Sequence, residues 1–208
     1  GYHQTILKPE NKDKLQYILD RGLTLETIKD WQIGYSDGAR DIYYDLKKDI
    51  PEKEIKSAGI FVSSTKDRFH DRIVFPIRNY RGQVVAFTGR WIVEIPHSGK
   101  YVNSPDSPIF KKSELMFGLD RAKMNIQKAK SVIIVEGQMD VIALHQAGFT
   151  NVVAISGTAL SSTQIRMLGR LTDQIYLCLD QDEAGKKATF SCIENLQNKD
   201  IDVRIITL

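Results

Sequence analysis

The chain has 208 residues, of which 42% are hydrophobic and 26% are charged, so it is long enough and apolar enough to build a packed core. Its longest apolar runs are about as long as a strand and far shorter than the roughly 18 residues of a membrane-spanning helix, which excludes a bilayer-spanning protein. The formal net charge of +3 favours no class of partner until its distribution along the chain is considered.

Two short helices are predicted near the N-terminus. Leu15, Ile18 and Leu19 form an apolar stripe with helical spacing, Gly22 ends that helix, and Thr24 is placed to cap the next one. DNA-binding helix-turn-helix proteins show a similar pattern. No basic recognition helix follows here, so we disfavour that interpretation.

Residues 71–91 predict a β-hairpin, because strand-like runs flank the turn signal NYRG. Residues 66–112 around it hold nine Lys or Arg against four Asp or Glu, a net charge of +5, while the rest of the chain has 20 against 22, or −2. A basic segment beside an acidic remainder suggests a phosphate-rich partner. A solvated face of long side chains explains the same distribution, and on charge alone we favour it.

The second half changes character and predicts a parallel sheet. The runs SVIIVE, NVVAIS, IYLCLD and VRIITL are apolar and mostly β-branched, as expected of strands that are covered on both faces. Helical patterns lie between them at residues 139–147, 161–171 and 184–197, and residues 121–130 resemble a linking helix. Alternating strands and helices imply right-handed crossovers.

Acidic residues follow two of these predicted strands. Glu136 ends the first strand, the stretch SGTAL follows the second, and Asp180 and Asp182 follow the third. The carboxyl ends of parallel strands share one edge of a sheet, so we expect these three carboxylates to converge. Like charges that lie close together need a proton or a cation between them, and oxygen ligands favour Mg²⁺ or Mn²⁺.

Glycines at three of these positions would let the backbone approach such a ligand closely: Gly137, Gly157 and Gly185. Simpler roles compete with metal binding. Asp182 is placed to cap the helix that follows it, and Asp140 lies in a first helical turn, where an acid complements the helix dipole. Cys178 and Cys192 lack a C-x-x-C spacing, so we expect buried free thiols rather than a zinc site or a disulfide.

The stretches VEGQMDVIALHQAGF and LDQDEAGKKA resemble a TOPRIM domain, the metal-binding fold of primases, topoisomerases and some nucleases, and in particular its form in bacterial DnaG-type primases. RGLTLETIKDWQIGYS, DRFHDRIVFPIRNYRGQVVAFTGR and KYVNSPDSPIFKKSELMFGLDRAK resemble motifs of the RNA polymerase domain of that family, in matching order. The resemblance covers nearly the whole chain. It implies an α/β protein, with a basic N-terminal α+β subdomain at residues 1–120 and a TOPRIM parallel-sheet subdomain at residues 121–208.

The resemblance also implies a DNA-dependent RNA polymerase that makes short primers on single-stranded DNA from NTPs by metal-assisted nucleotidyl transfer. Its catalytic and metal-binding acids would be Glu136, Asp180 and Asp182, with Asp140 as a further metal ligand. Two or more Mg²⁺ or Mn²⁺ ions are expected, without an organic cofactor and without zinc in this part of the protein. The family's motifs for nucleotide and template binding correspond here to Arg68, Arg72, Lys100, Tyr101, Asn103 and Lys111.

Several parts of the family pattern have no counterpart in these 208 residues. They are the acids that usually follow the last strand, the zinc-binding domain, the C-terminal helical subdomain and the helicase-binding domain. We therefore expect a fragment of a longer protein, with weak or no activity alone. Further partners implied by the resemblance are guanine alarmone nucleotides and, through the missing domain, the replicative helicase, in the cytoplasmic bacterial replisome and away from membranes.

Three other interpretations stay open. The chain could be a binding module that holds DNA or nucleotide without chemistry. It could be a TOPRIM nuclease or topoisomerase, although no segment convincingly supplies the nucleophilic tyrosine of a topoisomerase. It could also be a receiver-like protein phosphorylated on Asp180, which the absence of the expected lysine at a later strand end disfavours.

Overall fold

The computed structural model describes residues 1–38, 41–63, 66–94, 97–155, 159–197 and 201–207. Contacts within the chain define two compact units. Unit 1 comprises Gly1–Ile77 and Val84–Phe110, and unit 2 comprises Arg78–Gln83 and Lys111–Leu208. The domain boundary predicted between residues 120 and 121 stays a prediction.

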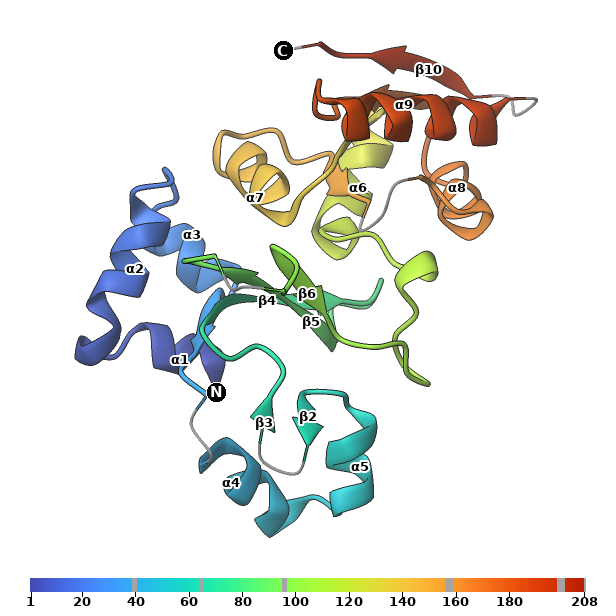
Figure 1. Cartoon of the computed structure of the whole chain (residues 1–208). Coiled ribbons are helices and arrows are strands. Elements are labelled where there is room, and N and C mark those ends of the chain that lie inside the picture. The colour runs from blue at the N-terminus through green and yellow to red at the C-terminus, as the bar shows by residue number, and fades with distance from the viewer. Residues whose placement is uncertain (39–40, 64–65, 95–96, 156–158, 198–200, 208) are drawn as a thin grey trace. The chain divides into compact units, whose positions relative to one another are not determined.

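Unit 1 is an α+β structure, as predicted (Figure 1). Its elements in chain order are α1 (Tyr2–Ile6), η1 (Pro9–Asn11), α2 (Lys12–Leu19), α3 (Leu25–Asp30), β1 (Gly34–Ser36), α4 (Asp41–Asp49), α5 (Glu52–Ser57), β2 (Phe61–Ser63), β3 (Lys66–Asp67), β4 (Arg72–Arg78), β5 (Val84–Trp91) and β6 (Tyr101–Asn103). The main sheet has the strand order β1-β4-β5-β6, and β2 pairs with β3 in a separate antiparallel sheet.

Local signals in the sequence account for the ends of these elements. The Thr24 side chain accepts a hydrogen bond from the Thr27 N–H at 3.1 Å and caps α3, as predicted. In the turn between β4 and β5, the Asn79 side chain accepts from the Arg81 N–H at 3.0 Å, and Gly82 has φ of +83°. A positive φ suits glycine, which has no Cβ, so the NYRG signal correctly located the hairpin turn.

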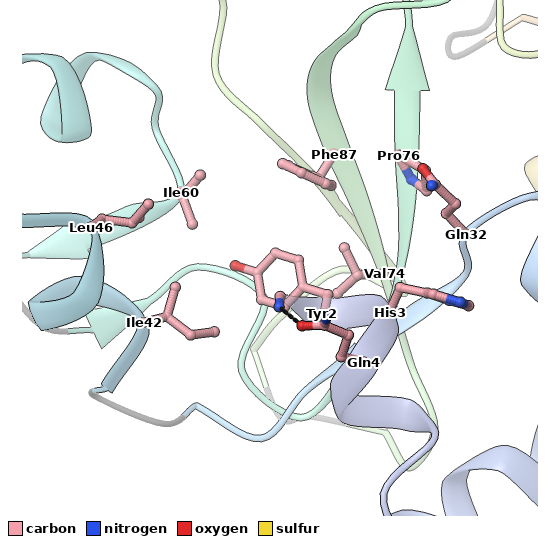
Figure 2. Close-up of a pocket in the computed structure, with 11 residues that line it drawn as sticks. Tyr2, His3, Gln4, Gln32, Ile42, Leu46, Ile60, Val74, Pro76 and Phe87 are labelled. Atoms are coloured by element: carbon pink, nitrogen blue, oxygen red, sulfur yellow. Dashed lines mark hydrogen bonds between the residues drawn. The ribbon is translucent and has the colours of Figure 1, made fainter. Parts of the chain in front are cut away.

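Unit 1 also contains a cavity of about 430 Å³ (Figure 2). Apolar side chains from α1, α4, β4 and β5 dominate its wall, among them Leu46, Val74 and Phe87. Tyr2 also lines it, and the Tyr2 hydroxyl donates to the buried Asp67 carboxylate at 2.9 Å. The described residues that line the cavity include none of the predicted site residues.

Unit 2 is built on a parallel sheet, also as predicted (Figure 1). Its elements are η2 (Lys112–Glu114), α6 (Leu119–Ala129), β7 (Val132–Val135), α7 (Gln138–Gln146), β8 (Val152–Ala154), α8 (Ser162–Leu168), β9 (Gln174–Leu177), α9 (Glu183–Leu196) and β10 (Asp202–Ile205). The strand order is β10-β9-β7-β8, and every neighbouring pair is parallel. The two strands that precede the predicted acids, β7 and β9, are therefore direct neighbours.

The core of unit 2 brings helices and strands together. Ile126 of α6, Leu168 of α8 and Cys192 of α9 are fully buried with Ile134 of β7 and Ile175 of β9. Both cysteines are free thiols, but only Cys192 is buried as predicted, whereas Cys178 is half-buried. Among the described helices, none is both long enough and apolar enough to cross a membrane.

The outermost strand differs from its prediction. We expected β10 to be covered on both faces, but three of its residues are exposed, and Ile205 retains 53% of its accessible surface. That expectation is wrong. In the described sheet β10 lies at one edge and pairs only with β9, and it is less covered than β8 at the other edge, whose three residues are all buried.

Candidate metal and nucleotide site

Glu136 and Asp180 lie at the carboxyl ends of neighbouring strands. Glu136 directly follows β7, and Asp180 lies in the loop after β9, whose residue Leu177 pairs with Ile134 of β7. The Glu136 Oε1 atom accepts a hydrogen bond from the Asp180 N–H at 3.3 Å. The fold therefore brings these two residues into direct contact.

The charges at this edge act on one another. Burial raises the pKa of the Glu136 carboxyl, and the negative charge of Asp180 raises it further, followed by smaller contributions from Asp182 and Asp140. Neighbouring carboxylates disfavour ionisation because like charges repel. An elevated pKa with this cause marks a position where a cation would be stabilised.

Asp182 has a structural role that the sequence also suggested. Its Oδ1 atom accepts from the Gly185 N–H at 2.8 Å and caps α9. Gly185 itself is buried in the first turn, where a Cβ atom would lie 2.0 Å from the Asp180 carbonyl oxygen and 2.8 Å from Glu136 Oε1. Only glycine lets α9 begin this close to the two acids.

Asp140 also makes a local contact. Its Oδ2 atom accepts from the Gly137 N–H at 3.0 Å, in the first turn of α7. The exposed Asp140 side chain is close enough to contribute to the raised pKa of Glu136. Asp140 thus accepts a hydrogen bond at the start of α7 and also lies near the carboxyl group of Glu136.

The chemistry of these side chains suits a hard divalent cation, because all four supply carboxylate oxygens. Within the described ranges, however, no three His, Cys, Asp or Glu side chains form a group that would hold one ion. Asp182 and Asp140 each direct one oxygen to a backbone N–H instead. The metal-binding set stays a prediction, and Gly157 falls outside the described residues.

Arg72, one of the predicted nucleotide-binding residues, is buried in unit 1 and only 2% exposed. Its guanidinium donates to the carbonyl oxygens of Gly89 and Lys100 at 3.2 and 3.1 Å and to the Ser98 hydroxyl at 2.7 Å. Burial lowers the pKa of the guanidinium. These bonds connect β4 to β5 and to the residues just before β6. The Arg72 guanidinium therefore stabilises the sheet of unit 1.

The other predicted nucleotide-binding residues differ in exposure. Arg68 is half-buried and donates through Nε to the Gly59 carbonyl at 2.7 Å, and Lys100 is exposed. Tyr101 and Asn103 are half-buried in β6, and the buried Oδ1 atom of Asn103 has no hydrogen-bond partner in the described part of the chain. These four residues belong to unit 1.

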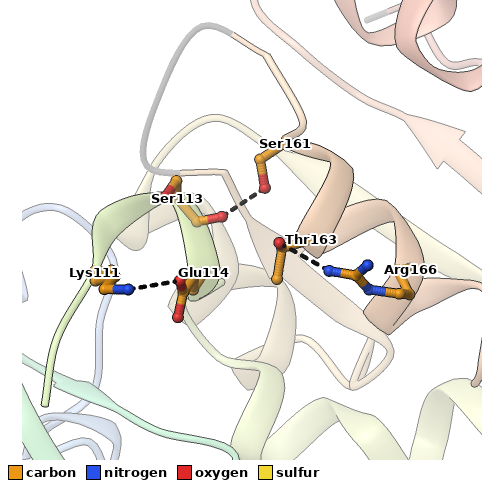
Figure 3. A network of polar contacts seen from close by, with 6 residues as sticks. All are labelled: Lys111, Ser113, Glu114, Ser161, Thr163 and Arg166. Carbon is orange, nitrogen blue, oxygen red and sulfur yellow. Dashed lines mark hydrogen bonds and ion pairs between the residues drawn. The ribbon is translucent and has the colours of Figure 1, made fainter.

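Lys111 is exposed and lies in unit 2, together with the acids. It pairs with Glu114 at 3.2 Å. Two side chains that the sequence analysis did not identify donate hydrogen bonds to backbone carbonyl groups shortly after Lys111. They are Ser161 (Figure 3) and Gln164. Ser161 was recognised only as a helix start, although the S-x-x-Q spacing of a capping box was visible in the sequence.

Comparison with known protein families bears on the interpretations left open. The family described as "DNA primase catalytic core, N-terminal domain" matches residues 1–123, and the Toprim-like family matches residues 133–208. The chain belongs to the DNA primase family. The resemblance seen in the sequence is confirmed, and so is the predicted combination of an α+β part with a Toprim parallel sheet.

Relatives among curated primases match this chain over all or nearly all of its length. The DNA primase of Enterococcus faecalis is 38% identical and aligns with 100% of the chain, which covers 35% of that protein. The DNA primase of Halalkalibacterium halodurans is 37% identical over 98% of the chain, again covering 35% of that protein. The chain thus spans about a third of the length of these primases.

Solved primase structures share the fold. A structure of the zinc-binding and RNA polymerase domains of the Aquifex aeolicus primase superposes with a TM-score of 0.90 at 35% identity, covering 100% of this chain and 52% of that one. A DnaG primase catalytic domain bound to single-stranded DNA superposes with a TM-score of 0.86 at 33% identity. The match covers 100% of this chain and 67% of that one.

Proposed function

We propose that this chain is the part of a DNA primase that binds single-stranded template and NTPs and joins ribonucleotides into a primer. The observation that carries the proposal is the contact between Glu136 and the Asp180 backbone, where two Toprim strands end in a chain of the primase family. The related catalytic domain bound to single-stranded DNA supports the template as a partner.

In primer extension the protein mainly aligns the reacting groups and neutralises phosphate charge, and it forms no covalent bond itself. The primer's 3′-hydroxyl attacks the α-phosphate of the incoming NTP, and pyrophosphate leaves. We assign Asp180 and Asp182, with Asp140, to hold Mg²⁺ or Mn²⁺, two or more ions in all. When bound, the metal supplies positive charge against the triphosphate.

Glu136 has two roles open to it, as a further metal ligand or as the group that takes the hydroxyl proton. The raised pKa of Glu136 suits the second role, because a base is most effective when its pKa lies near the working pH. Asp180 is its direct neighbour, so both roles place Glu136 beside the reacting phosphate in this proposal.

The basic residues would balance phosphate charge. Lys100 and Lys111 are exposed, which leaves their ammonium groups accessible to nucleotide or template phosphates. Arg68 and Arg72 contact carbonyl groups within unit 1, so in this proposal they shape the surface as well as contributing charge. Guanine alarmones, the replicative helicase and a place in the cytoplasmic replisome are further parts of the proposal, supported by family membership alone.

The experiment is to change Asp180→Asn in the full-length protein and to measure Mn²⁺-dependent nucleotide binding and primer synthesis on single-stranded DNA. We expect losses of about a hundredfold or more in synthesis, the scale seen when groups around a catalytic metal are altered. Asp173→Asn is the matched control, because Asp173 is an exposed acid just before β9, at the opposite end of the strand. Synthesis by the Asp180→Asn chain near the wild-type rate would refute the assignment. Nucleotide binding by the full-length wild-type protein without any synthesis would favour a binding module.

A further inference from the structure

The segment at residues 113–117 is tied to the rest of unit 2 through its backbone. The Ser113 carbonyl accepts from the Ser161 hydroxyl at 2.5 Å (Figure 3), and the Leu115 carbonyl accepts from Gln164 Nε2 at 2.8 Å. Phe117 exchanges two backbone hydrogen bonds with Ala154 of β8, at 3.1 and 3.0 Å. Alternate residues of the segment are therefore held by α8 and β8.

The two side chains that hold Ser113 and Leu115 also cap α8. Ser161 Oγ accepts from the Gln164 N–H at 3.1 Å, and Gln164 Oε1 accepts from the Ser161 N–H at 2.9 Å. Each side chain thus accepts a bond inside the helix start and donates one to the segment. A helix cap needs only the acceptors, so the two donated bonds serve a separate purpose.

The clamp formed by Ser161 and Gln164 rests on the core of unit 2. Gln164 is only 3% exposed, and the next residues on its helix, Ile165 and Leu168, pack in the same buried cluster as Ile134 of β7. Glu136 follows β7 directly. The clamp therefore fixes the segment to the sheet whose edge carries the acids.

The segment continues from Lys111, the first residue of this stretch of unit 2. Lys111 is exposed, and the Glu114 N–H donates to the Lys111 carbonyl at 2.9 Å, so its backbone is tied to η2 inside the clamped region. A lysine holds a phosphate best when its backbone is fixed, because less conformational entropy is then lost on binding.

We propose that Ser161 and Gln164 are positioning residues, which hold Lys111 in place for a nucleotide phosphate by clamping the carbonyl groups of Ser113 and Leu115. The inference rests on the proposed function, since it assumes that Lys111 meets the nucleotide. The clamp itself is tested without nucleotide.

The first experiment separates clamp from cap. Gln164→Glu keeps the acceptor that caps α8 but removes the amide donor to Leu115, and Ser161→Asp likewise keeps the cap but removes the hydroxyl donor to Ser113. We expect amide hydrogen exchange of Glu114 and Phe117 to quicken by about tenfold in either variant, since weakly held segments open more often. Thr163→Ala, which removes a hydrogen bond from Arg166 on the same helix, should leave it unchanged.

Ser161 is half-buried, so the Ser161→Asp chain stays informative if burial of a charge at position 164 prevents folding. Exchange at Glu114 and Phe117 that stays as slow in the folded Ser161→Asp chain as in the wild type would overturn the clamp.

The second experiment is a double-mutant cycle with Lys111→Ala, measured as Mn²⁺-dependent binding of a fluorescent ATP analogue. We expect Ser161→Asp to raise Kd by about fivefold in the wild-type background, the effect of one lost hydrogen bond, and to add nothing once Lys111 is gone. An equal effect in both backgrounds, or none in either, would overturn the role of the clamp in nucleotide binding. If the wild-type chain bound no nucleotide, both the proposed function and this role would fail, while the exchange result would still decide the clamp.

Discussion

The Oε1 atom of Glu136 accepts a hydrogen bond at 3.3 Å from the backbone N–H of Asp180, which lies 44 residues further along the chain. The bond connects the residue that follows β7 to the loop after β9. Because the donor is a backbone group, the Asp180 side chain is left to other partners. This relationship places the two acids on which the proposed chemistry depends beside each other.

Gly185→Ala should disrupt this arrangement. The added Cβ would lie 2.0 Å from the Asp180 carbonyl oxygen, so the start of α9 or the Asp180 loop must move. We expect a loss of about 1 to 3 kcal/mol of unfolding free energy, typical of overpacking, measured by urea denaturation. Gly169→Ala is the control, because a Cβ at Gly169 meets its nearest neighbour at 3.4 Å. Equal stability of the Gly185→Ala chain and the wild type would contradict the tight contact.

Glu136→Gln should stabilise the metal-free fold at neutral pH while weakening nucleotide binding. Burial and neighbouring carboxylates raise the pKa of Glu136, so the folded chain binds this proton more tightly than the unfolded chain does. Wild-type stability contributed by Glu136 is therefore present at acid pH and is lost as the pH rises through that raised pKa. Glutamine carries no charge and still offers an oxygen to the Asp180 N–H.

The measurement is the melting temperature of both chains in EDTA as a function of pH. The variant should melt higher at neutral pH, and the difference should vanish below about pH 4, near the pKa of an unperturbed Glu. A difference that is constant across pH would show that ionisation of Glu136 is not its cause.

Arg72→Lys should cost about 2 to 4 kcal/mol of stability, because a buried cation would lose hydrogen bonds that a single ammonium group cannot replace. Urea denaturation measures the change. Arg81→Lys, on the exposed hairpin turn, should stay within about 0.5 kcal/mol of the wild type. An Arg72→Lys chain of wild-type stability that no longer binds nucleotide would instead assign Arg72 to phosphate.

Lys111→Ala should reduce the salt dependence of binding to single-stranded DNA. If Lys111 contacts one phosphate, the slope of log Kd against log salt should change by about 0.7. Fluorescence anisotropy at several salt concentrations measures the slope, and Lys128→Ala, on the exposed last turn of α6, is the control. Glu114→Gln should strengthen binding, since it removes the carboxylate that pairs with Lys111. An unchanged slope for Lys111→Ala would place Lys111 away from the template.

Local patterns in the sequence were sufficient for most of the elements and for the order of strands and helices along the chain. The apolar stripe before Gly22, the cap at Thr24 and the turn at NYRG depend on neighbouring residues alone, and all three are confirmed. The exposure of the edge strand β10 was not predicted. An apolar run in the sequence has the same pattern whether or not other elements cover the strand it forms.

The sequence by itself determined the family, the two kinds of sheet and the acids at the strand ends. Each of these depends on patterns of residues that are close to one another along the chain. Only the tertiary structure decided that β9 lies directly beside β7, that the Arg72 guanidinium is enclosed by carbonyl groups, and that Ser161 and Gln164 reach the segment after Lys111. These relationships join residues far apart in the sequence, and they follow from how strands pair and side chains pack rather than from any local preference of the backbone.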